Sequence, residues 1–287
     1  MNSEELMTLM RDWLREPTAA HWTDADCYRK LNSRQRFLSE IIINASTGFF
    51  QRSTTISYVS GTATYDLPKM CARVVKVERI DGTYPVEVEP ITGSDEYRFI
   101  GNLILTPNSS SEGWLYEADA IRIAPQPAST ITDALRVRYI KWQPMLHSGA
   151  ASAVGASTIT FPAAPARGSI TAFTDAYEGM YVAITSGTGV GLLKKITAYN
   201  ATTRVATVES AWGAGAPVAG SIYAITPELP ERWHDLIAVG AAMDALKETK
   251  DDVTEVEGEY QRFESEFRTA MGIRQQQRPR RVHYIEP

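Results

Sequence analysis

Residues 23–45, TDADCYRKLNSRQRFLSEIIINA, predict a long amphipathic helix that Gly48 ends. The hydroxyl of Thr23 can cap free backbone amides, and Asp24 and Asp26 lie where the helix dipole favours acidic side chains. Apolar residues recur every three or four positions, as on one face of a helix. These apolar residues are Cys27, Tyr28, Leu31, Leu38, Ile41 and Ile42.

A shorter helix is expected over residues 3–15, where Pro17 stops it. Helices resume after Pro227, and Pro230 suits a first helical turn because its missing N–H costs nothing there. One face of the resumed helix carries Trp233, Leu236, Ile237, Gly240, Met243 and Leu246. A last helix has an apolar seam suited to a partner helix, and Gly272 is its expected C-cap. The seam residues are Val253, Val256, Tyr260, Phe263, Phe267 and Met271.

Between these helical ends, from about Ile56, the sequence changes to short segments rich in β-branched and aromatic residues. The expected strands are ISYV, TATYDLP, ARVVKVERI, YPVEVEPI, EYRFIG, NLILTP, DAIRIAP and ALRVRYIKW. Val75, Val77 and Arg79 alternate with Lys76, Glu78 and Ile80, which is typical of half-buried antiparallel strands.

The composition changes at Pro144. Small residues dominate residues 147–172, which predict a linker leading into edge strands. Four strands follow within about 50 residues, as expected for a small barrel or sheet inserted into a host domain. The glycine run 186–191 lacks the Lys-Ser/Thr pair of a phosphate-binding loop and no helix follows it, so it predicts a wide hairpin turn.

The sequence therefore predicts an α+β fold in which the terminal helices form a helical bundle core. An antiparallel β region and an inserted small β-barrel or sheet module complete it. The expected domains are a core of residues 1–145 and 227–272, which includes the β region 55–145, an inserted module 146–226, and a C-terminal arm 273–287.

Charge and composition exclude several classes of protein. The chain is ordinary for a globular protein, with 44% hydrophobic and 22% charged residues, and no stretch approaches the ~20 apolar residues of a membrane span. Glu4 and Glu5 stand where a secretory signal would carry Lys or Arg, so we expect synthesis in a cytoplasm. A net charge of −5 disfavours sequence-specific DNA binding.

Motifs for catalysis or metal binding are not found. The histidines His21, His147, His234 and His283 are scattered, and none has metal-ligand spacing to another histidine or to Cys27 or Cys71. No G-x-S-x-G elbow occurs, and adjacent acids such as Asp251 and Asp252 point apart. The sequence predicts a protein that is not an enzyme, with no catalytic residue, no metal and no cofactor.

The C-terminal tail, RQQQRPRRVHYIEP at 274–287, gives a stronger indication of a binding role. Its four arginines against Glu286 give a net charge of +3, whereas the helix over 250–271 carries seven acids and three bases, a net charge of −4. Such asymmetry can set polarity in an assembly. Val282, Tyr284 and Ile285 alternate as in a segment that adds a strand to another subunit. A merely disordered tail and a segment that orders on a partner both remain open, and the apolar residues favour the second.

Taken together, these segments resemble the head–tail adaptor (connector, or neck) proteins of tailed bacteriophages. The resemblance rests on the pattern Thr23-Asp24-Ala25-Asp26 through Leu31-Asn32 to Gln35-Arg36-Phe37-Leu38, and on Leu67-Pro68 before ARVVKVERI. It rests also on Leu135 to Tyr139 as a late strand and on Leu229-Pro230-Glu231 before an alanine-rich helix. The stretch 179–199 looks like a β module recurrent in phage structural proteins, and this insertion departs from the smallest adaptors.

The resemblance implies a structural protein of the virion neck, at the head–tail junction, made in the host cytoplasm. It implies a homo-oligomeric ring, usually of twelve copies, docked under the portal and bridging it to a tail (nozzle) or stopper protein. DNA would pass through the lumen without sequence-specific binding, and no membrane is involved. Helix packing in the ring would use Trp233, Leu236, Ile237, Tyr260, Phe263 and Phe267. The arm would bind the portal through Arg278, Arg280, Arg281, Val282, His283, Tyr284 and Ile285.

Two other functions stay open at this point. The chain could be a carbohydrate-binding or depolymerising tail protein, with Tyr177, Tyr181, Tyr199 and Trp212 of the module as exposed aromatic platforms, although these side chains suit the core of a small β unit better. It could also be a tail completion or stopper protein of the next ring down.

Overall fold

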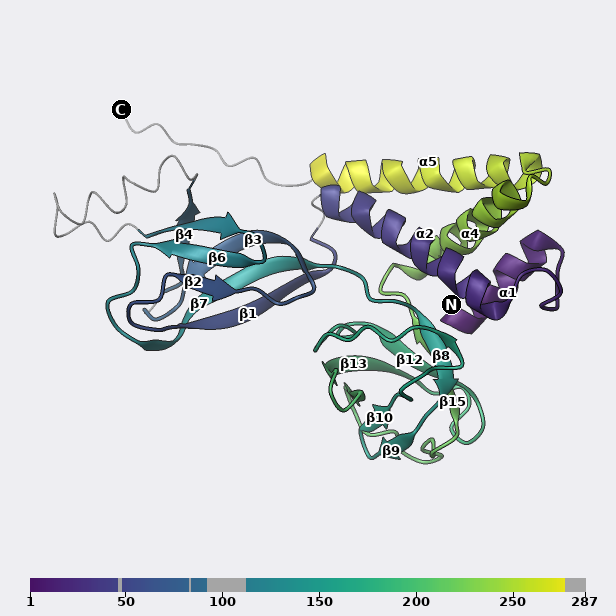
Figure 1. Cartoon of the computed structure of the whole chain (residues 1–287), viewed down its shortest axis with the longest axis horizontal. Coiled ribbons are helices and arrows are strands. Elements are labelled where there is room, and N and C mark those ends of the chain that lie inside the picture. Colours follow the sequence, from purple (N-terminus) through teal and green to yellow (C-terminus); the bar gives the residue numbers. More distant parts are fainter. Residues whose placement is uncertain (46–47, 83, 92–111, 277–287) are drawn as a thin grey trace. The chain divides into compact units, whose positions relative to one another are not determined.

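The computed structural model describes residues 1–45, 48–82, 84–91 and 112–276 (Figure 1). The chain divides into two compact units, and each is described here by itself. The first unit, called the helical–sheet unit below, comprises Met1–Thr47 and Gln143–Pro287. The second, the barrel unit, comprises Gly48–Trp142.

Among the residues that the structure describes, four α-helices belong to the helical–sheet unit. Their bounds are α1 Ser3–Leu14, α2 Asp24–Asn44, α4 His234–Thr249 and α5 Thr254–Gln276, with a 3-10 turn at Glu231–Trp233 before α4. The predicted start of α2 is confirmed, because the Thr23 hydroxyl accepts a hydrogen bond from the Asp26 amide at 3.2 Å. At α1, Asn2 and Glu5 form a reciprocal capping box.

One predicted boundary is wrong. Gly272 does not end the last helix, which continues to Gln276. A glycine ends a helix by adopting a positive φ, whereas Gly272 keeps a helical conformation and meets no atom within 4 Å of the position a Cβ would take.

The helices pack around α4, which lies against α1, α2 and α5 (Figure 1). Ten of its sixteen residues are buried. A mixed α+β chain is thus confirmed, but a helical bundle as the core is not supported. The helices are few, and an eight-stranded sheet in the same unit buries a separate interior of its own.

The sheet of the helical–sheet unit is antiparallel throughout, in the order β11-β8-β15-β12-β13-β14-β10-β9. Its strands are β8 His147–Ala150, β9 Ala153–Gly155, β10 Thr158–Thr160, β11 Arg167–Gly168, β12 Tyr181–Ser186, β13 Leu193–Asn200, β14 Val205–Val208 and β15 Ile222–Thr226. Its interior is aromatic: the rings of Phe161, Tyr177 and Tyr223 surround His147 with centroids 4.9–5.4 Å away.

Residues 147–172 are therefore not a linker, contrary to expectation. They form β8 to β11, and β8 lies inside the sheet between β11 and β15. Small side chains can line a core when larger ones from other segments fill the space, and here Tyr177, in the turn before β12, and Tyr223 of β15 do so. The prediction of edge strands holds for β9 and β11.

The glycine run joins β12 to β13 as a hairpin, as predicted. Gly187, Gly189 and Gly191 all have positive φ, between 84° and 88°. At Gly189 a Cβ would lie 2.9 Å from the Pro217 nitrogen, so the turn needs glycine there for space as well as for conformation.

The barrel unit is a seven-stranded sheet with the order β1-β7-β3-β4-β5-β6-β2, antiparallel except for β4 with β5. Its strands are β1 Gln51–Tyr58, β2 Thr64–Asp66, β3 Cys71–Arg79, β4 Val86–Pro90, β5 Gly113–Glu117, β6 Ala120–Ala124 and β7 Ile131–Lys141. The rings of Tyr58 in β1 and Tyr65 in β2 are 6.1 Å apart in one core, so the two edge strands approach each other and the sheet is nearly closed.

Sequence reasoning missed one strand and misplaced one residue in this unit. The missed strand is β5. In β3, a bulge between Val74 and Lys76 breaks the expected alternation, so Val75 is 42% exposed while Val77 is fully buried. The predicted strands EYRFIG and NLILTP lie outside the described residues.

Candidate functional site

The residues predicted for helix packing are brought together inside the helical–sheet unit. Trp233 and Phe267 meet edge to face with ring centroids 5.2 Å apart, which fastens the start of α4 to the later part of α5. Leu236 and Ile237 are buried in α4, Tyr260 is buried in α5, and Phe263 is half-buried. Their role in a ring of several copies stays a prediction.

A charged junction joins three of these helices. Arg34 of α2 donates to both carboxylate oxygens of Asp244 in α4, with the Nε–Oδ2 distance at 2.5 Å. It also donates to the Tyr260 hydroxyl at 3.1 Å and lies 4.9 Å from the centre of that ring. A planar guanidinium suits this combined bidentate and stacked contact, for which lysine would be a poor substitute.

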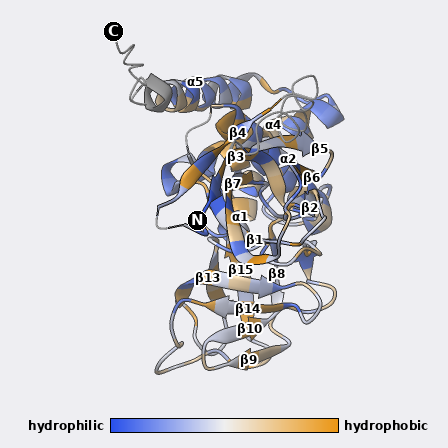
Figure 2. Cartoon of the chain, turned by 90° about the vertical axis from the view of Figure 1, so that its left-hand side faces the viewer, coloured by the Kyte–Doolittle hydropathy of each residue, from blue (hydrophilic) through white to orange (hydrophobic). Residues whose placement is uncertain are grey.

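Helix α5 has a buried stripe and a charged outer face. The stripe is Val256, Tyr260, Phe267 and Met271. Over Thr254–Gly272 the helix carries five glutamates and two arginines, and Figure 2 shows it mostly in the hydrophilic colour. Arg262 and Arg268 pair with Glu259 and Glu264 within the helix. The exposed face is therefore acidic on balance.

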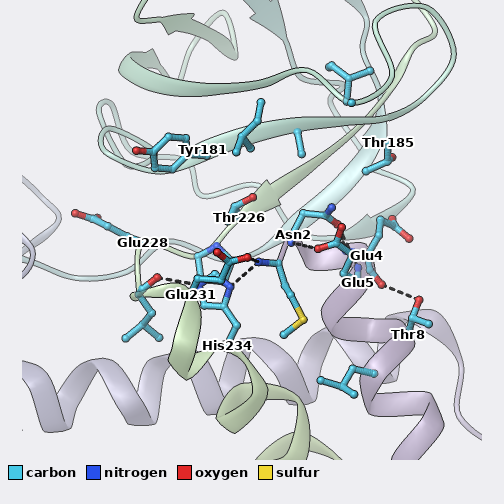
Figure 3. Close-up of a pocket in the computed structure, with 18 of the residues that line it drawn as sticks. Asn2, Glu4, Glu5, Thr8, Tyr181, Thr185, Thr226, Glu228, Glu231 and His234 are labelled. Carbon is cyan, nitrogen blue, oxygen red and sulfur yellow. Dashed lines mark hydrogen bonds and ion pairs between the residues drawn. The ribbon is translucent and has the colours of Figure 1, made fainter. Parts of the chain in front are cut away.

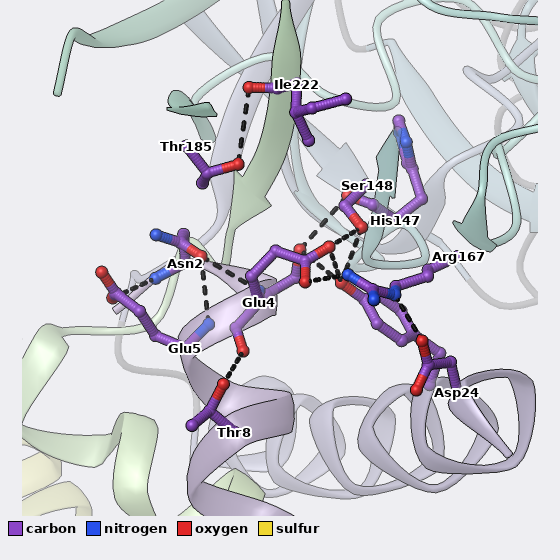
Figure 4. A network of polar contacts seen from close by, with 12 residues as sticks. Asn2, Glu4, Glu5, Thr8, Asp24, His147, Ser148, Arg167, Thr185 and Ile222 are labelled. Atoms are coloured by element: carbon purple, nitrogen blue, oxygen red, sulfur yellow. Dashed lines mark hydrogen bonds and ion pairs between the residues drawn. The ribbon is translucent and has the colours of Figure 1, made fainter. Parts of the chain in front are cut away.

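A polar network ties α1 and α2 to the eight-stranded sheet (Figure 4). Arg167 of β11 donates to Asp24 at 2.6 Å and also pairs with Glu4. Burial opposes ionisation of Asp24, but hydrogen bonds from Arg11 and Arg167 outweigh it and hold the pKa of this carboxyl below its usual range. The network thus fixes the helices on the sheet.

A wide groove of about 1090 Å³ opens beside this network (Figure 3). Its walls are the first turns of α1, the β12–β13 hairpin, and the segment 226–234 that leads into α4. Five carboxylates line it, and the described residues lining it include no lysine or arginine. These acids are Glu4, Glu5, Asp12, Glu228 and Glu231. Leu192, Leu193 and Leu229 are among the apolar residues there.

His234 lies in this groove as a packed side chain. Its Nε2 is 2.8 Å from the Leu229 carbonyl oxygen, and its Nδ1 is 2.9 Å from the Met1 amine. These contacts match a neutral ring protonated at Nε2. Burial lowers the pKa of His234, and the nearby ammonium group lowers it further.

His147 is fully buried in the aromatic core of the sheet, with Nδ1 3.0 Å from the Tyr223 hydroxyl. Burial lowers the pKa of His147 to about 3, so the ring stays neutral. Within the part of the chain that the structure describes, no three His, Cys, Asp or Glu side chains are grouped to hold a metal ion.

On the barrel unit, Glu78 sits on the face opposite the apolar core and pairs with Lys76, Arg136 and Arg138 at 2.8–3.1 Å. Burial opposes its ionisation, but the hydrogen bonds from the three cations outweigh burial and lower the pKa of Glu78 to about 2. This cluster is a cross-strand contact of β3 and β7.

The aromatic platforms considered for carbohydrate binding are mostly absent from the surface. Tyr177, Tyr199 and Trp212 are buried, at most 3% exposed. Tyr181 is 37% exposed and lines the groove. A single exposed ring gives little support to a carbohydrate-binding face.

The residues predicted to bind a portal, Arg278 to Ile285, lie outside the described residues. Among the described residues, no helix is both long enough and apolar enough to span a bilayer.

The groove near the start of α1 was missed by sequence reasoning. Its acids come from two separate stretches, 4–12 and 228–231, and Leu192 and Leu193 of its apolar lining come from a third, so spacing along the chain gave no signal for it.

The helices and the two sheets define a mixed α+β protein. The family model described as SU10 adaptor protein matches residues 1–169 of the 287. The chain belongs to this family of phage head-to-tail adaptors. The matched part includes α1, α2, the barrel unit and the strands up to β11, whereas α4, α5 and the C-terminal tail lie beyond it. The search of curated proteins found no match.

Proposed function

We propose that this phage adaptor protein forms a ring of twelve copies under the portal, in the neck of the virion, where it bridges portal and tail and encloses the DNA channel. The observation that carries the proposal is the adaptor-family match over more than half of the chain. Adaptors of this kind are structural, and the proposal assigns the chain no catalytic step and no cofactor.

The charge of α5 supports a role beside DNA. A conduit should repel phosphates rather than hold them, because each neutralised phosphate releases counterions and strengthens binding. The outer face of α5 is acidic on balance, and its buried stripe fastens it to the rest of the helical–sheet unit. We therefore propose that α5 faces the lumen.

Ring closure needs a heterologous interface, in which one face of a subunit complements a different face of the next. In this proposal Trp233, Tyr260 and Phe267 act by fixing α4 against α5, so that the outer faces keep a constant geometry. The barrel unit would face the tail or the neighbouring subunit. We also propose that residues 146–226 form an inserted module and that residues 273–287 form the arm that docks on the portal.

The arm is proposed to bind the portal through its arginines and through Val282, His283, Tyr284 and Ile285. Each arm alone would bind weakly, but many arms on one ring gain in avidity. The test is a pull-down with the portal protein of the same phage. Deleting 274–287 should leave a folded protein that no longer binds portal.

A matched pair of triple variants makes this test sharper. Replacing Arg278, Arg280 and Arg281 by alanine should abolish capture, whereas replacing the adjacent Gln275, Gln276 and Gln277 by alanine should preserve it. Unchanged capture by the arginine variant would refute the arm assignment. Measuring particle mass with and without portal separates an adaptor from a stopper protein of the next ring, since the adaptor is expected to assemble only on the portal.

A further inference from the structure

The outer surface of the barrel unit carries a patch of cations, called the basic face below. The pairing of β7 with β1 and β3 determines which side chains of these strands lie on the side away from the apolar core. On this side are Arg73, Lys76 and Glu78 of β3, Arg136 and Arg138 of β7, Ser53 and Thr55 of β1, and, beside Glu78, Glu87 of β4. Four cations against two acids give the basic face a net charge of +2, in a chain whose net charge is −5.

A buried acid at the centre of the basic face fixes its cations. Glu78 is only 5% exposed, and it pairs with Lys76 at 3.0 Å, Arg136 at 2.8 Å and Arg138 at 3.1 Å. Lys76 also pairs with Glu87 at 3.3 Å. The three cationic side chains remain 31–39% exposed, so the charge that reaches solvent is mainly positive. Because these side chains are already held in place, binding a ligand costs them little further conformational entropy.

The composition of the basic face favours a phosphate backbone over a protein surface. Ser53 and Thr55 are exposed, Gln51 is half-buried, and the apolar Ile140 on the same side is only 2% exposed. Of the large apolar side chains in β1, β3 and β7, strands that the structure describes in full, only Val75 at the bulge is exposed. Protein interfaces are centred on apolar and aromatic side chains. Arginine, lysine, serine, threonine and glutamine are the side chains that contact phosphates.

We propose that the basic face binds the phosphate backbone of duplex DNA without reading its sequence. The inference rests on the proposed function in one respect, because the adaptor ring would enclose DNA and so make it the anionic polymer at hand. Three strands ~4.8 Å apart and four residue steps along β7 give a face of about 10 by 14 Å. A 14 Å length of duplex carries about eight phosphates, which is more than the cations of one copy can neutralise.

The basic face and the outer face of α5 act on DNA with opposite sign. The acidic face of α5 repels phosphates, whereas the basic face attracts them. A contact made by a few cations is weak and sensitive to salt, but the copies of a ring add their contacts together. The ring would therefore hold DNA that has reached the neck, while each single contact stays easy to break.

Fluorescence anisotropy of a short labelled duplex tests the contact in the full-length chain. If three cations of one copy neutralise three phosphates, affinity should fall about 40-fold between 50 and 200 mM salt. Arg136→Gln with Arg138→Gln should bind more weakly at 50 mM and lose only about 3.5-fold over the same range. Arg29→Gln with Arg36→Gln is the control, because it removes the same charge from two exposed positions of α2 and should behave as the wild type.

Two further measurements separate charge from folding. Arg136→Lys with Arg138→Lys keeps both charges, although it loses the forked donors to Glu78, and should keep the wild-type salt dependence. If the glutamine variant does not fold, the wild-type chain decides: bound DNA should protect Lys76 from acetylation and leave the exposed Lys195 of β13 unprotected. Protection of neither lysine, or equal protection of both, overturns the proposal.

The same variants decide between DNA and a second copy as the occupant. Wild-type affinity and salt dependence in the folded glutamine variant overturn the proposal. If light scattering without DNA then shows that this variant has lost self-association, the basic face belongs to an acidic surface of a second copy. Loss of DNA binding in a variant that still assembles on the portal supports the proposal. Failure of the wild type to form a ring, with DNA binding intact, would bear only on the proposed function.

Discussion

Helices α4 and α5 belong to the same unit and pack against each other, yet they use their residues in opposite ways. Nearly two thirds of α4 is buried, and its alanines and glycine allow three helices to approach it. Helix α5 buries one stripe and exposes an acidic face. The difference indicates that α4 determines whether the unit folds, whereas the outer face of α5 is free to serve an assembly.

The largest expected effect is on the contact between the two helices. Phe267→Ala removes a fully buried ring that packs on Trp233. Because truncation leaves a cavity, the free energy of unfolding should fall by about 3–5 kcal/mol. Urea denaturation measures this, and Phe263→Ala, at a half-buried position, should cost clearly less. Equal losses at the two positions would contradict the assigned packing.

Substitutions at two glycines, one in α4 and one in α5, should change the stability of the protein in opposite directions. A Cβ at Gly240 of α4 would lie 2.8 Å from the Tyr260 ring and 3.0 Å from Arg34 Cδ, so Gly240→Leu should destabilise the protein by about 3 kcal/mol through overpacking. At Gly258 of α5 a Cβ meets nothing within 4 Å. Gly258→Ala should therefore stabilise the protein by about 1 kcal/mol, the usual gain in helix propensity.

Thermal denaturation of the two glycine variants is the measurement. The expected result is a lower melting temperature for Gly240→Leu and a higher one for Gly258→Ala than for the wild type. A gain in stability at Gly240 would mean that α4 is not as closely packed as described.

The pH dependence of stability should report on the start of α4. Since the pKa of His234 is lowered in the folded state, the unfolded chain binds the proton more readily as the pH falls below about 6.5. Stability is therefore complete above this pH and declines below it, by up to about 1.4 kcal/mol per pH unit for one proton.

His147 should add to the same decline, because burial lowers its pKa to about 3. His234→Gln is expected to leave a shallower profile between pH 6.5 and 5, measured by urea denaturation at each pH, and His21→Gln, at an exposed position, is the control. An unchanged slope in His234→Gln would contradict a buried neutral ring.

The smallest effect on stability is expected on the outer face of α5. Glu259→Gln with Glu266→Gln should change the free energy of unfolding by less than about 0.5 kcal/mol, since exposed ion pairs contribute little. If α5 faces DNA, assembled rings of this variant should retain DNA more strongly than wild-type rings do, and this difference should be larger at low salt than at high salt. Retention equal to wild type would argue against a lumenal α5.

Much of the fold could be predicted because local signals were strong. The cap at Thr23, the apolar stripes of α1 and α2, the strands β12 to β15 and the glycine hairpin all follow from spacing and turn residues. The strand β8 could not be predicted from its own sequence, HSGA, because its small residues do not reveal that Phe161 and Tyr223 will pack against His147. The bulge at Val75 is likewise set by pairing with β7.

By itself the sequence determined where helices begin, where strands turn, and the contrast between an acidic helix and a basic tail, since these depend on neighbours within a few residues. Only the tertiary structure decided which acids share a groove and that Arg34 joins Asp244 to Tyr260. The physical reason is that these features depend on residues brought together across as many as 230 positions of chain, where periodicity carries no information.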